Sequence, residues 1–166
     1  KAKQALQAAA QRLSAMGRLH DRLAMPRDSA AKVNARNFFE RLCDDLQASL
    51  GDEHPVQLLP MIESCDVSQR QATVAGHLLS ELIDDVNRRS CIGEPVSITV
   101  DFTCENDICT LMLIEQRSSS AAALRPNRPL IASLLDRLQG SLEIAETASP
   151  TCLIRFPRDH AATASS

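Results

Sequence analysis

The strongest constraint on the fold is a strict alternation of apolar and polar residues at positions 96–105. Val, Ile, Val, Phe and Cys take the even positions, while Ser, Thr, Asp, Thr and Glu take the odd ones. A period of two is typical of a strand that buries one face. The next two residues, Asn106 and Asp107, suit a two-residue hairpin turn. The sequence therefore predicts a hairpin with one face on the core.

The turn fixes the register of the predicted hairpin, because residues directly opposite each other share one face of the sheet. The predicted pairs on the core face are Cys104 with Cys109, Phe102 with Leu111, Val100 with Leu113, and Ile98 with Glu115. Glu115 is therefore expected to point toward the apolar side.

The cysteines give little sign of metal or disulfide chemistry. They lie at positions 43, 65, 91, 104, 109 and 152, without a C-x-x-C motif or a Cys/His cluster at zinc spacing. The sequence shows no signal peptide and no long apolar run. We therefore expect a cytoplasmic protein with reduced thiols. Cys104 and Cys109 are expected to be small core thiols, and the alternative is a redox switch.

Periodicity and turn residues divide the rest of the chain into further elements. Helices are predicted at 1–24, 31–50, 68–89 and 129–139, and further strands at 55–65, 141–146 and 151–157. This order predicts an α/β protein with a helical element at residues 1–27, a two-layer α/β sandwich with a mixed sheet at 28–158, and a flexible tail at 159–166.

The N-terminal segment is basic and has an apolar seam. Residues 1–27 contain six Lys or Arg against the single acid Asp21. The seam repeats at spacings of three and four through Leu6, Ala9, Leu13, Met16, His20 and Leu23. So short a seam needs a partner helix, which predicts a homodimer. The chain has no Trp or Tyr, so we expect no nucleic acid partner and no membrane contact by this segment.

Three segments resemble bacterial sensor histidine kinases of the HWE or HisKA_2 type. Residues 12–23 are similar to the second helix of the dimerisation bundle, and 35–50 to the helix that opens the ATPase domain. Residues 80–86, Ser-Glu-Leu-Ile-Asp-Asp-Val, resemble the family motif N-E-L-v-x-N-A on the third helix of that domain. The resemblance implies the histidine-kinase-type (GHKL) ATPase fold, with a mixed sheet.

The resemblance also assigns the nucleotide-binding positions. In the family, the second Asn of the motif holds the magnesium ion, and here that position is Asp85, while Glu81 is kept. A carboxylate can ligate magnesium, so Asp85 is the candidate metal ligand. Glu81 and Asp85 lie four residues apart on one helical face and repel each other unless a cation joins them. Glu115 matches the acid that contacts adenine.

The glycines of the nucleotide site are missing. The family's D-x-G-x-G motif falls at residues 115–119, Glu-Gln-Arg-Ser-Ser, and no glycine occurs between Gly93 and Gly140. Glycines let the backbone approach a ligand closely. Arg117 in this place would fill the pocket. We therefore expect no bound cofactor, or only weak Mg-ATP binding. The alternative interpretation is a solvated helix face and a Glu115 carboxylate paired with Arg117.

His20 and Asp21 form a candidate catalytic pair on the bundle helix. A neutral imidazole can attack phosphorus while the neighbouring carboxylate orients it or takes its proton. The family's phosphoacceptor lies on the first bundle helix, and His20 matches the second-helix histidine better. The alternative is a histidine in a helix–helix contact.

The resemblance predicts a two-component signalling protein, the C-terminal part of a divergent histidine kinase that docks a response regulator receiver domain. Two alternatives stay open: a histidine phosphotransferase that uses His20, and a non-enzymatic dimerisation or interaction module on the same fold.

Overall fold

The computed structural model describes residues 31–50, 56–90, 94–117, 128–145, 147 and 149–159. Its elements are β1 (Lys32–Asn34), α2 (Ala35–Ser49), β2 (Val56–Ile62), β3 (Asp66–Ser68), α3 (Gln69–Arg89), β4 (Val96–Glu105), β5 (Ile108–Arg117), α4 (Arg128–Leu138), β6 (Ser141–Ala145) and β7 (Thr151–Pro157). The predicted helix at 1–27, with His20 and Asp21, lies outside the described residues, as do residues 118–127.

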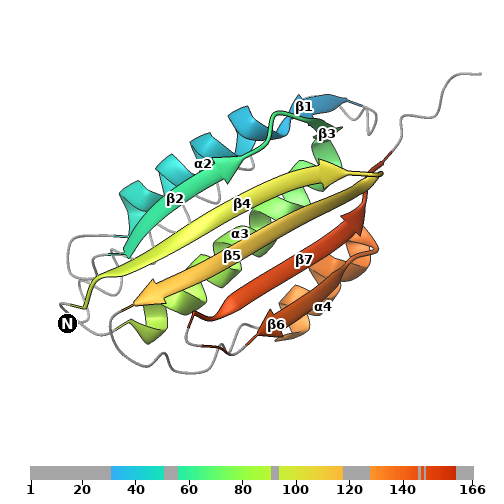
Figure 1. Ribbon diagram of the computed structural model, residues 1–166. Helices are drawn as coiled ribbons and strands as arrows, with labels where there is room; N and C mark the ends of the chain where they lie inside the picture. The colour runs from blue at the N-terminus through green and yellow to red at the C-terminus, as the bar shows by residue number, and fades with distance from the viewer. Residues whose placement is uncertain are drawn as a thin grey trace, which may run out of the picture.

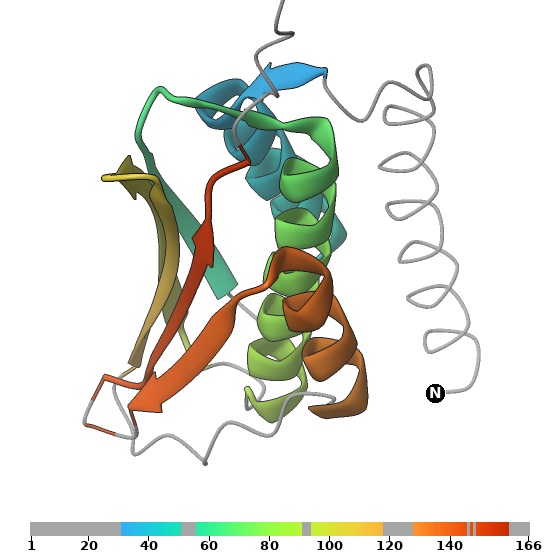
Figure 2. The same ribbon diagram turned by 90° about the vertical axis from the view of Figure 1, so that its right-hand side faces the viewer.

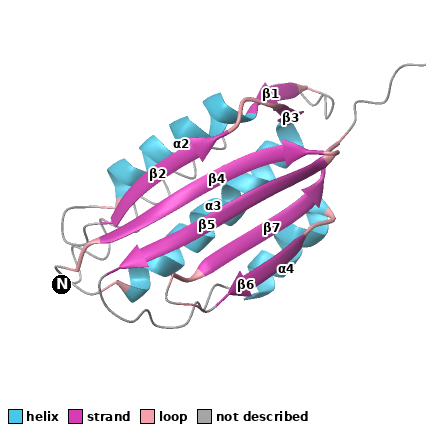
Figure 3. Ribbon diagram, viewed as in Figure 1, coloured by secondary structure: helices cyan, strands magenta, loops and turns pink. Residues whose placement is uncertain are grey.

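A five-stranded mixed sheet forms one layer of the fold. Its strand order is β2-β4-β5-β7-β6, with β2 parallel to β4 and the other neighbours antiparallel. Helices α2, α3 and α4 cover one face of this sheet, as two perpendicular views show (Figure 1 and Figure 2). Colouring by secondary structure separates the two layers (Figure 3). The predicted two-layer α/β sandwich is therefore confirmed.

The β4–β5 hairpin has the predicted register. Cys104 lies opposite Cys109, and Ile98 lies opposite Glu115. The turn residues Asn106 and Asp107 have φ values of 47° and 63°. Two consecutive positive φ values indicate a type I′ turn, whose twist matches that of the strands. Local turn chemistry thus places Glu115 on the helix-facing side of the sheet.

The core lies between the sheet and the helices, and helix α3 runs through its middle. The buried apolar side chains of α3 include Ala72, Ala75, Leu78, Leu79, Leu82, Ile83 and Val86. Three phenylalanines from different elements meet in this core. The ring centroid of Phe102 lies 4.7 Å from that of Phe39 and 6.3 Å from that of Phe156. Helix α2 is therefore anchored to the sheet through aromatic contact as well as aliphatic packing.

Two short strands were not predicted. β1 and β3 pair antiparallel, with Val33 opposite Val67, and each is three residues long. Three residues are too few to show a period of two. As a result, the helix predicted from residue 31 begins at Ala35, where the Asn34 side chain accepts a hydrogen bond from the Asn37 amide.

The outer edge of β2 is bonded to side chains of α2. The Gln47 amide nitrogen donates to Val56 O at 2.8 Å, and its oxygen accepts from the Leu58 N–H at 2.7 Å. Arg36 Nε donates to Ile62 O at 2.9 Å. Pro60, between these residues, has no N–H to satisfy. Side chains of one helix therefore satisfy several backbone polar groups of this edge strand.

The last described residues are held at the start of α3. Asp159 accepts hydrogen bonds from the Ser68 hydroxyl at 2.7 Å and from Arg70 at 3.1 Å. The Gln71 side chain donates to Pro157 O and accepts from the Asp159 N–H. Asp159, which we expected in the flexible tail, therefore belongs to the folded domain.

Candidate functional site

Two of the predicted site residues are buried carboxylates. Asp85 projects from α3 and Glu115 from β5, and each residue is 3% exposed. An ionised carboxylate loses its hydration in such a place, which is costly unless cations or hydrogen-bond donors replace the water. The groups that neutralise these two carboxylates therefore determine the chemistry of the site.

Two arginines neutralise them. Arg89 Nε donates to Asp85 Oδ2 at 2.9 Å, and the same guanidinium donates to Glu115 Oε2 at 3.1 Å. Arg117 forms an ion pair with the other oxygen of Glu115. We call Asp85, Arg89, Glu115 and Arg117 the buried ion cluster. Its two positive and two negative charges balance, and it joins the C-terminal turns of α3 to the end of β5.

The members of the cluster differ in their access to solvent. The Arg117 side chain is 2% exposed and that of Arg89 is 10% exposed. Arg88 also approaches Asp85, at 3.7 Å, but its side chain is 46% exposed. An exposed pair at that distance adds little. Arg89 is therefore the central cation, because it touches both carboxylates.

The alternative interpretation of these residues, a solvated helix face and a Glu115 carboxylate paired with Arg117, is only partly correct. The pairing of Glu115 with Arg117 is found, whereas a solvated helix face is wrong for Asp85. Glu81 lies one helical turn before Asp85 and is partly exposed. Arg89 was missed, although its spacing of four residues from Asp85 is a recognised ion-pair spacing on helices.

The cluster leaves poor conditions for a magnesium–nucleotide complex. Magnesium prefers carboxylate oxygens in a near-octahedral shell, and the Asp85 carboxylate is already bonded to Arg89. A cation at Asp85 Oδ2 would compete with this arginine. Within the described ranges, no group of three or more His, Cys, Asp or Glu residues is arranged to hold a metal ion. As the side chains lie, one oxygen of the expected magnesium ligand Asp85 is bonded to an arginine of the protein itself.

One thiol lies near the cluster. Cys152 on β7 is buried, and burial raises the pKa of its thiol to about 12, with Arg89 lowering that pKa and Asp85 and Glu115 raising it further. A thiol with such a pKa is almost never the thiolate near neutral pH. Cys152 is therefore a packing residue and not a nucleophile.

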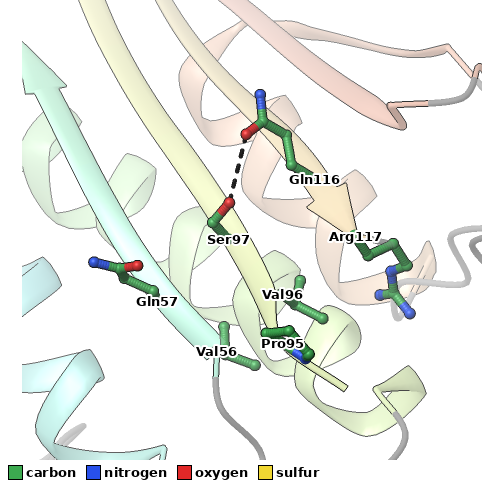
Figure 4. Close-up of a pocket in the computed structure, with 7 residues that line it drawn as sticks. All are labelled: Val56, Gln57, Pro95, Val96, Ser97, Gln116 and Arg117. Carbon is green, nitrogen blue, oxygen red and sulfur yellow. Dashed lines mark hydrogen bonds between the residues drawn. The ribbon is translucent and has the colours of Figure 1, made fainter. Parts of the chain in front are cut away.

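A shallow hollow of about 590 Å³ lies at the end of the sheet next to the cluster (Figure 4). Its lining residues come from β2, β4, β5 and the residue before β4: Val56, Gln57, Pro95, Val96, Ser97, Gln116 and Arg117. Ser97 Oγ lies 3.5 Å from Gln116 Oε1. Arg117 is the only ionisable residue among these seven, and it is paired with Glu115. The lining therefore offers amides and a hydroxyl but no acid–base pair.

The sequence and the fold both point to one class of proteins. Residues 1–50 match the HisKA_2 family model, described as "Histidine kinase". None of the curated proteins matches the sequence. None of the described helices has the length and apolar character needed to cross a membrane.

Three solved structures show the similarity of the fold. The histidine kinase domain of the blue-light activated histidine kinase from Erythrobacter litoralis EL346 has a TM-score of 0.71 at 12% identity, covering 91% of this chain and 75% of that one. Histidine kinase AdeS from Acinetobacter baumannii gives 0.60 at 12%, covering 95% and 80%. A structure described as a bacterial phosphotransferase gives 0.60 at 9%, covering 90% and 75%.

The chain thus has the sequence pattern of a histidine kinase over residues 1–50 and the fold of the catalytic region of sensor histidine kinases over its described part.

Proposed function

We propose that the chain acts in two-component phosphosignalling as the C-terminal part of a divergent sensor histidine kinase. In this proposal, residues 1–27 form the dimerisation helix and residues 28–158 a degenerate ATPase-like domain that docks a response regulator receiver domain. The match of residues 1–50 and the fold support the signalling class.

The buried ion cluster is the observation that carries the proposal of lost or weakened ATP binding. The family's magnesium position, Asp85, is bonded to Arg89, and its adenine-contacting position, Glu115, is bonded to both Arg89 and Arg117. The protein's own guanidinium groups therefore supply the positive charge. A nucleotide would have to break buried ion pairs before it gained its own contacts.

Calorimetric titration of the chain with ATP and magnesium tests this proposal. We expect no saturable binding in the micromolar range. The matched variant is Glu143→Gln, which removes one partner of an exposed ion pair and should behave as the wild type does. Micromolar affinity in the wild-type chain would overturn the claim of degeneracy.

A histidine phosphotransferase is the second candidate function. It needs no nucleotide, which suits the proposed loss of ATP binding, and one protein of similar fold is described as a bacterial phosphotransferase. In this case His20 would accept a phosphoryl group from one receiver domain and pass it to another, with Asp21 orienting the imidazole. Both residues lie outside the described part.

Incubation with a phosphorylated receiver domain distinguishes the candidates. Label on the wild type but not on His20→Ala would establish the phosphotransferase, with Asp21→Asn expected to lower the rate. No label on either protein, together with binding of the receiver domain, supports the docking role. Absence of both label and receiver binding would leave the third candidate, a non-enzymatic dimerisation or interaction module, and would remove the other two.

A further inference from the structure

We propose that Cys104 and Cys109 form a redox-active pair, which exchanges between disulfide and dithiol with low-molecular-weight thiols and disulfides of the glutathione type. The structure joins the two residues by a disulfide, contrary to the reduced core thiols expected from the sequence. This site lies at the opposite end of the β4–β5 hairpin from Glu115, and the proposal does not depend on the signalling role.

The hairpin holds both sulfurs in position. Cys104 and Cys109 lie directly opposite each other, one pair away from the turn, with Cα atoms 4.2 Å apart. This separation is typical of a non-hydrogen-bonded antiparallel pair, where facing side chains come closest. Because the turn at Asn106 and Asp107 sets the register, the two thiols stay opposite each other when the bond opens.

The fold does not need the bond. β4 and β5 pair along ten positions each, and the crosslink spans only five residues of sequence separation. Closing so short a loop removes less entropy from the unfolded chain than closing a long one. The pair can therefore open and close while the hairpin stays folded, which a crosslink essential for folding could not do.

Access to the two sulfurs is unequal. Cys109 is fully buried, whereas Cys104 is partly exposed. An incoming thiolate therefore attacks Cys104 Sγ, the S–S bond breaks, and its electron pair goes to Cys109 Sγ, which takes up a proton. A second small thiolate then attacks the small molecule's sulfur in the mixed disulfide. One small disulfide leaves, Cys104 takes up a proton, and the protein holds two thiols. The reverse sequence restores the bond.

The other described cysteines are expected to exchange with small thiols and disulfides less readily than this pair. Burial raises the pKa of both Cys43 and Cys152 to about 12, so their thiols are scarcely ionised. Burial also raises the pKa of Cys65, which is half-buried. Within the described part of the chain, exchange is therefore expected at the pair first.

The turn beside the pair is bonded to the last described residues. Asp107 O accepts the Arg158 N–H at 2.8 Å, and the Arg158 guanidinium donates to Asp66 O at 2.6 and 2.9 Å. The Cys104 N–H donates to Glu63 Oε2 at 3.2 Å. Opening the disulfide should therefore loosen the contacts of residues 155–159 with the hairpin, while the turn keeps its register.

The test equilibrates the full chain in buffers with a graded ratio of reduced to oxidised glutathione. The exchange is stopped with acid, and free thiols are then alkylated with iodoacetamide in denaturant, so that the buried Cys109 also reacts, and read peptide by peptide. We expect the alkylated fraction at Cys104 and Cys109 to rise together from almost none to almost all, reversibly, while far-UV circular dichroism stays constant. Amide hydrogen exchange of residues 155–159 should become several-fold faster in the reduced protein.

Two variants complete the test. The double variant Cys104→Ser with Cys109→Ser should fold and lose the redox dependence of amide exchange, whereas Cys65→Ser should keep the wild-type response. The proposal is wrong if the pair stays alkylatable in every buffer, if it opens only when the protein unfolds, or if the double variant does not fold.

Discussion

Glu115 shows how far one residue can be placed from sequence. Alternation and the two-residue turn placed its side chain on the core face, and the structure confirms that register. Its partners were harder to find. Arg117 is two residues away and was recognised, but Arg89 comes from another element. Whether Arg89 reaches Glu115 depends on how α3 packs on β5. No local sequence pattern encodes that packing.

Removing the Glu115 charge should strongly destabilise the fold. Glu115→Gln leaves Arg117 buried with no full negative partner, and breaking a buried pair in this way costs about 3–5 kcal/mol. Urea unfolding followed by circular dichroism measures this change. Glu143→Gln, in the exposed pair with Arg155, is the matched control and should cost less than about 1 kcal/mol. Equal effects of the two substitutions would contradict the stated burial of the cluster.

The buried thiols should make stability fall at alkaline pH. Burial raises the pKa of Cys43 and Cys152 from 9.0 to about 12, so the folded state favours the protonated thiol. This stabilisation is complete below pH 9 and is lost as the pH rises from about 9 to 12, because the unfolded chain ionises first. The free energy of unfolding at about pH 8 and about pH 10 tests this. Cys152→Ala should show a smaller difference than the wild type.

The length of each helix or strand determined whether its periodicity could be recognised in the sequence. α3 and the β4–β5 hairpin are long enough to show their periods, and the core face of the hairpin was predicted correctly. β1 and β3 have three residues each and became visible only through their pairing. In α4, period and apolarity would place Leu130, Leu134, Leu135 and Leu138 on one face, but Leu130 and Leu135 are only partly buried and Ile131 is buried. Packing against α3 selects among neighbouring apolar residues.

The hairpin turn should be sensitive to side chains that resist a positive φ. Asn106→Val places a β-branched residue at φ 47° and should cost at least about 1 kcal/mol, whereas Asn106→Gly should be neutral or slightly stabilising. Thermal unfolding of the two variants beside the wild type measures the difference. A turn with another conformation would show no preference for glycine over valine.

At the scale of the whole molecule, the sequence predicted the layers but not the complete buried ion cluster. The predicted dimer seam in residues 1–27 stays a prediction. A charge in the seam, as in Leu13→Asp, should convert a dimer to a monomer without changing the sandwich, whose described core is built from residues 35–156. Sedimentation velocity measures this, and Gln11→Asp, outside the seam, should keep the dimer. A monomeric wild type would remove the seam hypothesis.

The bonding of α2 to β2 has a consequence for self-assembly. An exposed edge strand is a template on which another chain can add a strand, and repeated addition leads to fibres. Here Gln47 occupies the backbone groups of Val56 and Leu58 that an added strand would use, and Pro60 offers no donor. This end of the sheet is closed to further strands as long as α2 stays docked, so undocking of one helix would turn a folded domain into a seed for aggregation.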